Sequence, residues 1–347
     1  MTAQSSLRRP TLAVTGGDPC GVGPEVILKA LTGAAPLEAR LLIIGDLAVF
    51  EQTARRLRLR LPRWRVASSH EPPGAWGHPL TFMDCAHRGA FQPGRFSGRA
   101  GAASAAYLDR AIGLWRQGLV NGLVTAPVTK RAVQQARSRF SGQTEYLAGA
   151  LGVRCPVMMF VSPRLRVVLL TRHLPLRAVA ARVTPTLLRH TVTVTMEGLR
   201  HWFGIRRPRL AVCGVNPHAG EGGLFGDEER RVLLPVLRYF HRKRVRLDGP
   251  FAADGFFARL VDDGCGGSAS ACGYDAVVCW YHDQGLIPFK LMARDIGCQM
   301  TLGLPLVRTS PDHGSALDIA GTGRAHPGSM RYALHLACQF ASRSSLR

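Results

Sequence analysis

The chain has 347 residues, of which 46% are hydrophobic, so it can fill the cores of two ordinary domains or of one large domain. This composition excludes a fibrous or disordered protein, and no run approaches the roughly 18 apolar residues of a membrane span. The N-terminus has no apolar segment after its arginines, so we expect a soluble, cytoplasmic protein.

The net charge of +22 raises the question of nucleic-acid binding, because a basic face releases counterions from phosphates. The arginines are dispersed along the whole chain, however, and form neither a tail nor a basic helix. We therefore expect the charge to attract anionic small molecules and do not expect nucleic acid as the main partner. Lysine is rare in this arginine-rich chain and can mark a place that needs a compact amine; its four positions are Lys29, Lys130, Lys243 and Lys290.

The nine cysteines form no C-x-x-C pair, and several of them lie in apolar runs. This is typical of small buried thiols and not of a disulfide framework or a zinc knuckle.

Short runs rich in Val, Ile and Leu alternate with longer amphipathic segments. The predicted strands are 11–16, 40–45, 122–126, 156–161, 166–171, 209–215 and 275–281, and the clearest predicted helices are 101–117, 184–203 and 228–242. Near-continuous apolar strands that alternate with helices predict a doubly wound α/β fold with covered sheets.

Polar clusters rich in Gly and Pro directly follow five of these strands. In doubly wound folds the carboxyl ends of the strands carry the ligand-binding loops, so we expect a site built from these clusters. They are G-G-D-P-C-G-V-G-P-E (16–25), T-A-P-V-T-K (125–130), T-R-H-L-P (171–175), N-P-H-A-G-E-G-G (216–223) and H-D-Q-G (282–285).

The first cluster leads into a helix that Pro24 and Glu25 open, because proline is favoured at the first helical position. It lacks the third glycine of the G-x-G-x-x-G dinucleotide fingerprint. Taken alone, it is typical of a tight turn.

Three of the twelve histidines end strands in these clusters: His173, His218 and His282. Imidazoles at neighbouring strand ends can converge on one divalent metal. Their spacing matches no compact metal motif, so a metal site and ordinary loop histidines are equally good interpretations of the pattern.

Two further segments suggest anion binding. Gln143 and Thr144 lie at a helix start, where free backbone N–H groups favour an anion, although a simple cap explains them as well. In the tail segment 303–323, Arg308 has the planar fork that clamps a phosphate or carboxylate. Asp312 and His313 are predicted to open a helix whose N-terminus faces a nucleotide.

Seven motifs, in order between residues 16 and 323, resemble those of the 4-hydroxythreonine-4-phosphate dehydrogenase (PdxA) family of pyridoxal phosphate biosynthesis. The motifs are G-D-P-x-G-x-G-P-E, T-x-P-x-x-K, G-x-T-E, H-L-P-L, N-P-H-A-G-E-G-G, Y-H-D-Q-G-x-x-P-x-K and R-T-S-x-D-H-G-x-A-x-D-x-A-G-x-G.

The resemblance implies a fold like that of the isocitrate and isopropylmalate dehydrogenases, with two α/β domains flanking a cleft. We place the first domain at 1–128 plus 303–347 and the second at 129–302. It also implies a homodimer whose active site lies at the subunit interface.

The resemblance implies one divalent metal, such as Zn, Co or Mg, on His173, His218 and His282. Two of these ligands would come from one subunit and the third from its partner. Imidazole suits zinc or cobalt, whereas magnesium would rely more on water.

The substrate contacts implied by the resemblance are Gln143, Thr144, Lys290, Gln299 and Arg308. The two glutamines depart from the family pattern, which commonly has His and Asn there. Gln143 can donate a hydrogen bond but cannot carry a charge, so weaker phosphate binding or a different substrate is an open alternative.

The implied reaction is an NAD- or NADP-dependent oxidation of a secondary alcohol, followed by decarboxylation. The cofactor would lie near Asp312, His313 and Gly314. Lys290, or a water beside Asp254, would take the proton, although Lys290 could equally be a charged phosphate contact.

Several alternatives stay open at this stage. A related dehydrogenase of threonate or erythronate 4-phosphate would use the same contacts, and a dihydrodiol dehydrogenase would not need them. A metal-dependent phosphohydrolase or a nucleic-acid-binding side activity is a further alternative. The segment 262–273 is expected to be a surface insert.

Overall fold

The computed structural model describes residues 9–32, 37–68, 78–87, 90–262 and 273–344. The chain forms two compact units. Unit 1 comprises Met1–Pro156 and Leu304–Arg347, and unit 2 comprises Val157–Gly303. The predicted insert at 262–273 lies almost wholly outside the described residues.

Unit 1 is built on a parallel sheet. Its strands, in spatial order, are β3 (Arg65–Ser68), β4 (Leu80–Asp84), β2 (Arg40–Gly45), β1 (Thr11–Thr15), β5 (Gly122–Thr125) and β12 (Val307–Pro311). The four residues of β5 and all of β1 after its first residue are buried, as expected for a sheet covered on both faces.

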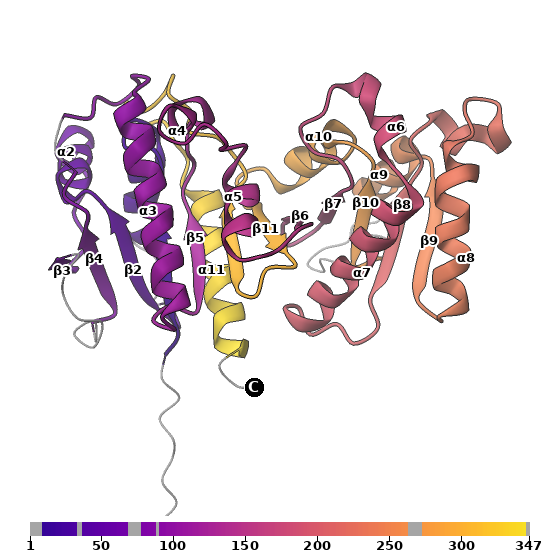
Figure 1. Cartoon of the computed structure of the whole chain (residues 1–347), viewed down its shortest axis with the longest axis horizontal. Coiled ribbons are helices and arrows are strands. Elements are labelled where there is room, and N and C mark those ends of the chain that lie inside the picture. The colour runs from indigo at the N-terminus through magenta and orange to yellow at the C-terminus, as the bar shows by residue number, and fades with distance from the viewer. Residues whose placement is uncertain (1–8, 33–36, 69–77, 88–89, 263–272, 345–347) are drawn as a thin grey trace, which may run out of the picture. The chain divides into compact units, whose positions relative to one another are not determined.

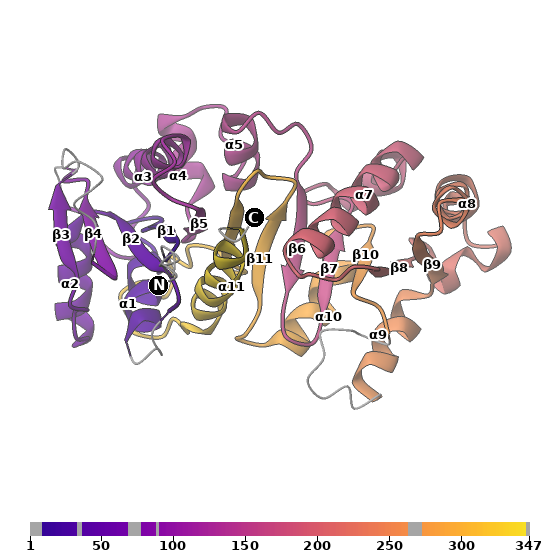
Figure 2. The same ribbon diagram turned by 90° about the horizontal axis from the view of Figure 1, so that it is seen from below.

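The helices of the described part of unit 1 are α1 (Gly23–Leu31), α2 (Leu47–Leu57), α3 (Gly98–Arg116), α4 (Lys130–Ala136), α5 (Gln143–Ala150) and α11 (Gly328–Ser344). Helices α3 and α4 lie on one face of the sheet, and α1 and α11 lie on the other (Figure 2). Alanine and glycine on α3 allow this close packing, and buried Tyr107 and Ile112 fill the space toward the sheet, whereas Leu108 packs with Val133 of α4.

Unit 2 has a mixed sheet. Its strands, in spatial order, are β11 (Cys298–Leu302), β6 (Val157–Val161), β7 (Arg166–Leu169), β10 (Ala276–Cys279), β8 (Arg209–Cys213) and β9 (Arg246–Phe251). Strand β6 runs antiparallel to both β11 and β7, whereas β7, β10, β8 and β9 are parallel. The carboxyl ends of those four strands therefore lie at the same edge.

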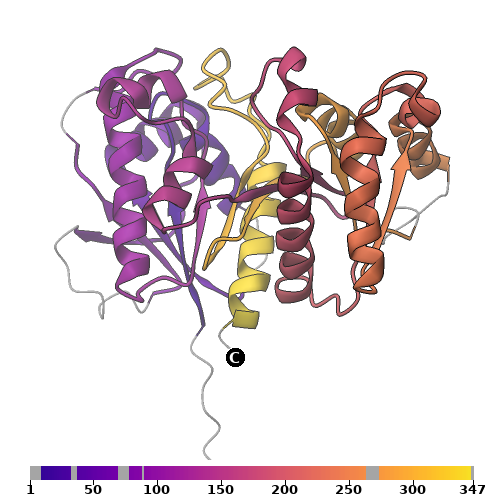
Figure 3. The same ribbon diagram turned by 45° about the vertical axis from the view of Figure 1, so that its right-hand side comes forward.

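The helical segments of unit 2 are η2 (Leu176–Ala178), α6 (Val179–Arg182), α7 (Pro185–His201), η3 (Pro217–Gly223), η4 (Glu229–Leu233), α8 (Leu234–Arg242), α9 (Ala253–Asp262) and α10 (His282–Ala293). Helices α7 and α8 stand side by side on one face (Figures 1 and 3). Thr184 caps α7 by accepting a hydrogen bond from the backbone of Leu187, and Pro185 opens the helix.

The α/β class predicted from the alternating pattern is confirmed, and each of the seven predicted strands and three predicted helices corresponds to an observed element. Five strands were not predicted: β3, β4, β9, β11 and β12. The second unit also begins later than the residue 129 we expected, because α4 packs against α3 of unit 1.

No helix among the described residues is long and apolar enough to span a membrane. Five of the seven described cysteines are buried.

Candidate functional site

The glycine-rich loop after β1 is attached to the tail segment of unit 1 by close backbone contacts. The amide of Val22 donates to the carbonyl of Ser315 at 2.9 Å. A Cβ atom on Gly21 would lie 2.8 Å from that carbonyl, and one on Gly23 would lie 2.4 Å from the carbonyl of Gly16. Only glycine permits this approach, so the G-V-G sequence allows the loop after β1 to pack directly on the segment around Ser315, a contact that we call the loop junction.

Asp18 lies buried in this junction, with 2% of its surface exposed. Its carboxylate accepts a hydrogen bond from the amide of Cys20 at 2.9 Å. Burial raises the pKa of Asp18 above its ordinary value, and hydrogen bonds from Thr129 and Cys20 act in the opposite direction. Thr129 also contacts the hydroxyl of Ser315 at 2.7 Å, so this network links three separate loops.

Arg308 lies in the buried strand β12 with only 2% of its surface exposed. Its guanidinium donates to the hydroxyl of Thr125 at 2.6 Å and to the side-chain oxygen of Gln143 at 3.2 Å. A longer contact of 3.4 Å reaches the hydroxyl of Thr144. These three groups are neutral, and the planar fork of a guanidinium is suited to binding an anion.

Helix α5 brings two of the predicted substrate contacts to Arg308. Gln143 and Thr144 begin the helix, as predicted, after Gly142 with a φ of 162°. Thr144 is buried, and the first-turn N–H groups of the helix point toward this end. Thr125, which the sequence did not single out, completes the group because it ends β5 beside β12.

The helix that we predicted to start near Gly314 is not present. After β12 the chain forms turns, Ala316 has a φ of 41°, and the next helix is α11. The backbone amide of Asp312 binds the hydroxyl of Ser329, which in turn donates to the Asp312 carboxylate at 2.9 Å. Asp312 is therefore bound to the start of α11, which prevents it from capping a helix of its own.

His313 and Gly314 lie in the turn that follows. The Nδ1 atom of His313 lies 2.9 Å from the carbonyl of Gly314. Its Nε2 atom is buried and has no hydrogen-bond partner among the described residues. A buried ring nitrogen of this kind fits a ligand contact.

In unit 2, the rings of His173 and His282 lie side by side, with centroids 6.1 Å apart and an interplanar angle of 41°. His173 follows β7 and His282 opens α10 after the neighbouring strand β10. Nδ1 of His282 lies 2.6 Å from a carboxylate oxygen of Asp283. This contact orients the imidazole and leaves Nε2 for a ligand, in the way that carboxylates support metal-binding histidines.

His218 lies in η3, where five consecutive residues from His218 to Gly222 have φ values between 40° and 81°. Among the described residues, no three His, Cys, Asp or Glu side chains are grouped to hold a metal ion. The residues of one chain thus bring together two of the three predicted ligands. An imidazole pair at this distance fits part of a transition-metal site, because Zn–N bonds are about 2.0–2.1 Å long.

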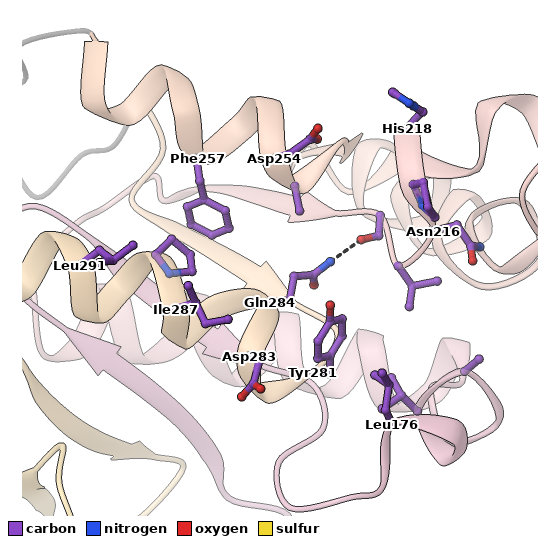
Figure 4. Close-up of a pocket in the computed structure, with 17 residues that line it drawn as sticks. Leu176, Asn216, His218, Asp254, Phe257, Tyr281, Asp283, Gln284, Ile287 and Leu291 are labelled. Atoms are coloured by element: carbon purple, nitrogen blue, oxygen red, sulfur yellow. Dashed lines mark hydrogen bonds between the residues drawn. The ribbon is translucent and has the colours of Figure 1, made fainter.

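A pocket of about 740 Å³ lies beside η3 in unit 2. Phe257, Ile287 and Leu291 gather at one end of it and Asn216 and His218 at the other, with Gln284 between them (Figure 4). Its carboxylates are Asp283 and the predicted catalytic residue Asp254, which lies in the first turn of α9. The predicted acid is therefore near one of the predicted metal ligands.

The two remaining predicted residues lie on different elements of unit 2. Lys290 is exposed on α10, eight residues after His282, which corresponds to about 12 Å along the helix axis. Gln299 is buried in β11, with 4% of its surface exposed, and its amide donates to the hydroxyl of Thr301.

Known proteins resemble this chain over nearly its whole length. The family described as "Pyridoxal phosphate biosynthetic protein PdxA" matches residues 38–337. A 4-hydroxythreonine-4-phosphate dehydrogenase from Aromatoleum aromaticum is 42% identical, over 94% of this chain and 95% of its own. An enzyme of the same name from Chromobacterium violaceum is 41% identical, over 98% of this chain and 99% of its own.

Solved structures agree with these relatives. The crystal structure of 4-hydroxythreonine-4-phosphate dehydrogenase from Klebsiella pneumoniae is similar with a TM-score of 0.81 and 34% identity, covering 97% of this chain and 100% of that chain. A terephthalate 1,2-cis-dihydrodiol dehydrogenase from Burkholderia xenovorans LB400 has a TM-score of 0.60 and 28% identity, with coverages of 96% and 98%. By its sequence and its fold, this chain belongs to the PdxA family of pyridoxal phosphate biosynthetic proteins.

Proposed function

We propose that the chain oxidises 4-hydroxythreonine 4-phosphate with NAD or NADP, in pyridoxal phosphate biosynthesis. The product would be 2-amino-3-oxo-4-phosphooxybutanoate, which loses carbon dioxide to give 3-amino-2-oxopropyl phosphate. Relatives named 4-hydroxythreonine-4-phosphate dehydrogenase support the proposal, because they are 38–42% identical to this chain over most of its length. The observation that carries it is the buried guanidinium of Arg308 beside Thr144 at the start of α5, because a phosphorylated substrate needs such a group.

Arg308 and Thr144 would bind the substrate phosphate. A planar guanidinium can donate two parallel hydrogen bonds to phosphate oxygens, and the α5 N-terminus adds backbone donors. Gln143 would hold the guanidinium in place through its side-chain oxygen. Lys290 and Gln299 would make the remaining substrate contacts.

His173 and His282 of one subunit, with His218 of a second copy, would hold one divalent metal ion such as Zn, Co or Mg. The imidazole pair of His173 and His282 supports this assignment. When bound, the metal lowers the pKa of a substrate hydroxyl and stabilises developing negative charge.

Asp312, His313 and Gly314 would contact the nicotinamide cofactor, which accepts a hydride when it is bound. The buried Nε2 of His313 supports this part of the proposal. In the oxidation, the hydroxyl-bearing carbon gives up a hydride and the hydroxyl gives up a proton. The resulting β-keto acid can then release its carboxylate as carbon dioxide, because the ketone accepts the electron pair of the broken bond.

Lys290, or a water beside Asp254, would take the hydroxyl proton. Such general-base help contributes about 10²–10⁴-fold to a rate. Asp254 is exposed at the pocket that also contains His218, so a water has access to it. If Lys290→Arg weakens substrate binding without lowering kcat, the base is not Lys290.

A homodimer would complete the metal site, and the surface of unit 2 is suited to one. Large apolar side chains near the histidines are exposed, including Leu176 at 70%, Leu224 at 73% and Leu291 at 73%. Large apolar side chains that are exposed in this way favour contact with another protein surface.

Formation of NADH from 4-hydroxythreonine 4-phosphate, with and without EDTA, tests the proposal. We expect a signal that EDTA abolishes and added Co²⁺ restores. Threonate and erythronate 4-phosphate belong in the same assay, because Gln143 and Gln299 leave their oxidation as an alternative. No NADH from 4-hydroxythreonine 4-phosphate in the presence of metal would refute the main proposal, and activity in EDTA would refute the metal role.

A further inference from the structure

The loop that contains His218 is bonded to the buried carboxylate of Glu229, and the neighbouring Glu228 accepts a further hydrogen bond from the Asn216 side chain at 2.7 Å. Glu229 has 5% of its surface exposed, and it begins the π-helical turn η4. Its Oε1 atom accepts hydrogen bonds from the backbone amides of Val215, at 2.7 Å, and Asn216, at 2.9 Å. Its Oε2 atom accepts a third from the side-chain amide of Asn216 at 2.9 Å.

Two glycines make room for this carboxylate. A Cβ atom on Gly214 would lie 2.9 Å from Oε1 of Glu229, and one on Gly220 would lie 2.7 Å from Oε2. Gly220 also has a φ of 81°, in the middle of the left-handed stretch that begins at His218. The loop is therefore wrapped around the Glu229 side chain on both sides of His218.

The same backbone is fixed from its other side by the element that contains His282. The side-chain amide of Gln284 donates to the carbonyl of Gly214 at 2.6 Å (Figure 4). The indole of Trp280 donates to the carbonyl of Cys213 at 2.7 Å. Residues 213–216 are thus hydrogen-bonded to Trp280 and Gln284 on one side and to Glu229 of η4 on the other, so the backbone that leads into the left-handed run is fixed.

We infer that Glu229 is a positioning residue that sets the place of His218 for metal binding. This inference rests on the proposed metal role of His218. A left-handed run of five residues, three of them not glycine, is unfavourable by itself and persists only where its surroundings determine it. The three hydrogen bonds to Glu229 fix the backbone at Val215 and Asn216, just before that run, and π-helical turns such as η4 are frequent at functional sites.

Glu229→Gln tests the inference with almost no change of shape. The amide nitrogen that replaces one carboxylate oxygen is a donor, so it cannot accept a hydrogen bond from Asn216. We expect a Co²⁺ dissociation constant about 10–100-fold higher, measured by titration of the full-length chain and the visible absorption of bound Co²⁺. We also expect faster hydrogen exchange at the amides of Val215 and Asn216 in the metal-free protein, which is a readout of the loop itself.

Two comparisons separate positioning from a general loss of stability. Glu197→Gln removes the same charge from an exposed position on α7 and should leave Co²⁺ binding unchanged. In a His218→Ala background, Glu229→Gln should cause no further loss of Co²⁺ affinity, because its effect acts through the histidine.

If Glu229→Gln binds Co²⁺ with wild-type affinity, the inference is overturned. It is also overturned if Glu229→Gln lowers the Co²⁺ affinity as much in the His218→Ala background as it does in the wild type. A wild-type chain that does not bind Co²⁺ would overturn the metal proposal, and this inference with it. Faster exchange at Val215 and Asn216 without any change in Co²⁺ affinity would overturn the inference alone.

Discussion

The side chain of Gln143 bridges two elements of unit 1 by accepting a hydrogen bond from Arg308 at 3.2 Å and donating one to the carbonyl of Ala126 at 2.9 Å. The direction of these two bonds is determined, because the guanidinium can only donate and the carbonyl can only accept. Gln143 therefore presents an oxygen to Arg308 and keeps the guanidinium oriented without neutralising it.

A Gln143→Glu substitution would place a carboxylate in that position. The new ion pair would compete with the substrate phosphate for Arg308. We expect KM for the phosphorylated substrate to rise by about tenfold or more, since one charge-assisted hydrogen bond is worth about 1.5–3 kcal/mol. Gln135→Glu, an exposed position on α4, is the matched control for added negative charge. An unchanged KM in Gln143→Glu would show that Arg308 does not bind the phosphate.

Substitution of His173 or His282 by alanine should weaken metal binding to a similar extent, because both imidazoles are proposed as ligands of one ion. Co²⁺ titration followed by visible absorption measures this, and dialysis against EDTA provides the metal-free reference. His201→Ala, an exposed histidine at the end of α7, should bind Co²⁺ as the wild type does. If only one of the two site variants lost affinity, the 6.1 Å ring pair would not be a shared site.

The sequence predicts the strands that are apolar and misses β12, in which several of the buried residues are polar. Strand β12, with the sequence V-R-T-S-P, is buried at all five positions and contains Arg308, Thr309 and Ser310. Hydrogen bonds satisfy these groups, including one from the Thr309 hydroxyl to the carbonyl of Ala333 on α11. Such partners are distant in sequence, so hydrophobic patterning cannot indicate this strand.

The same limit applies to the site. Strand ends and motif order indicated Arg308, Gln143 and the histidines, because those features are local in the sequence. Glu229 could not be identified, since its role depends on a loop that folds back around it. The absent helix near Gly314 has a similar cause: Asp312 was predicted as a helix start, but its carboxylate is bound to Ser329.

Two glycines of α3 should respond in opposite ways to replacement by alanine. A Cβ atom on Gly101 would lie 2.0 Å from the carbonyl of Ala132 on α4, whereas one on Gly113 would meet nothing within 4 Å. Gly101→Ala should therefore lower the free energy of unfolding by about 1–3 kcal/mol or more, as overpacking does. Gly113→Ala should raise it by about 0.5–1 kcal/mol, because alanine is the better helix former.

Urea unfolding of both glycine variants measures the difference. The comparison also tests the placement of α4 in unit 1, since only its packing on α3 makes Gly101 sensitive. Equal effects of the two substitutions would argue against that packing.

Asp18 should give the protein a pH-dependent contribution to its stability. Burial raises the pKa of Asp18 in the folded chain above the ordinary value of 3.8, so the folded state favours the protonated carboxyl. Below pH 3.8 the carboxyl is protonated in both the folded and the unfolded chain, and the contribution of Asp18 to the stability of the folded chain is fully present. As the pH rises through the folded-state pKa, ionisation in the buried junction destabilises the folded chain, and that contribution is lost.

Asp18→Asn replaces the ionisable carboxyl with a neutral group of the same shape. The measured quantity is the difference in the free energy of unfolding, wild type minus Asp18→Asn. We expect this difference to fall as the pH rises from 3.8 through the folded-state pKa of Asp18. Urea unfolding of both proteins between pH 3.5 and 8 measures this difference, and Asp318→Asn controls for loss of one exposed charge. A difference that rises with pH would mean that the hydrogen bonds from Thr129 and Cys20 outweigh burial, so that Asp18 is held in its ionised form.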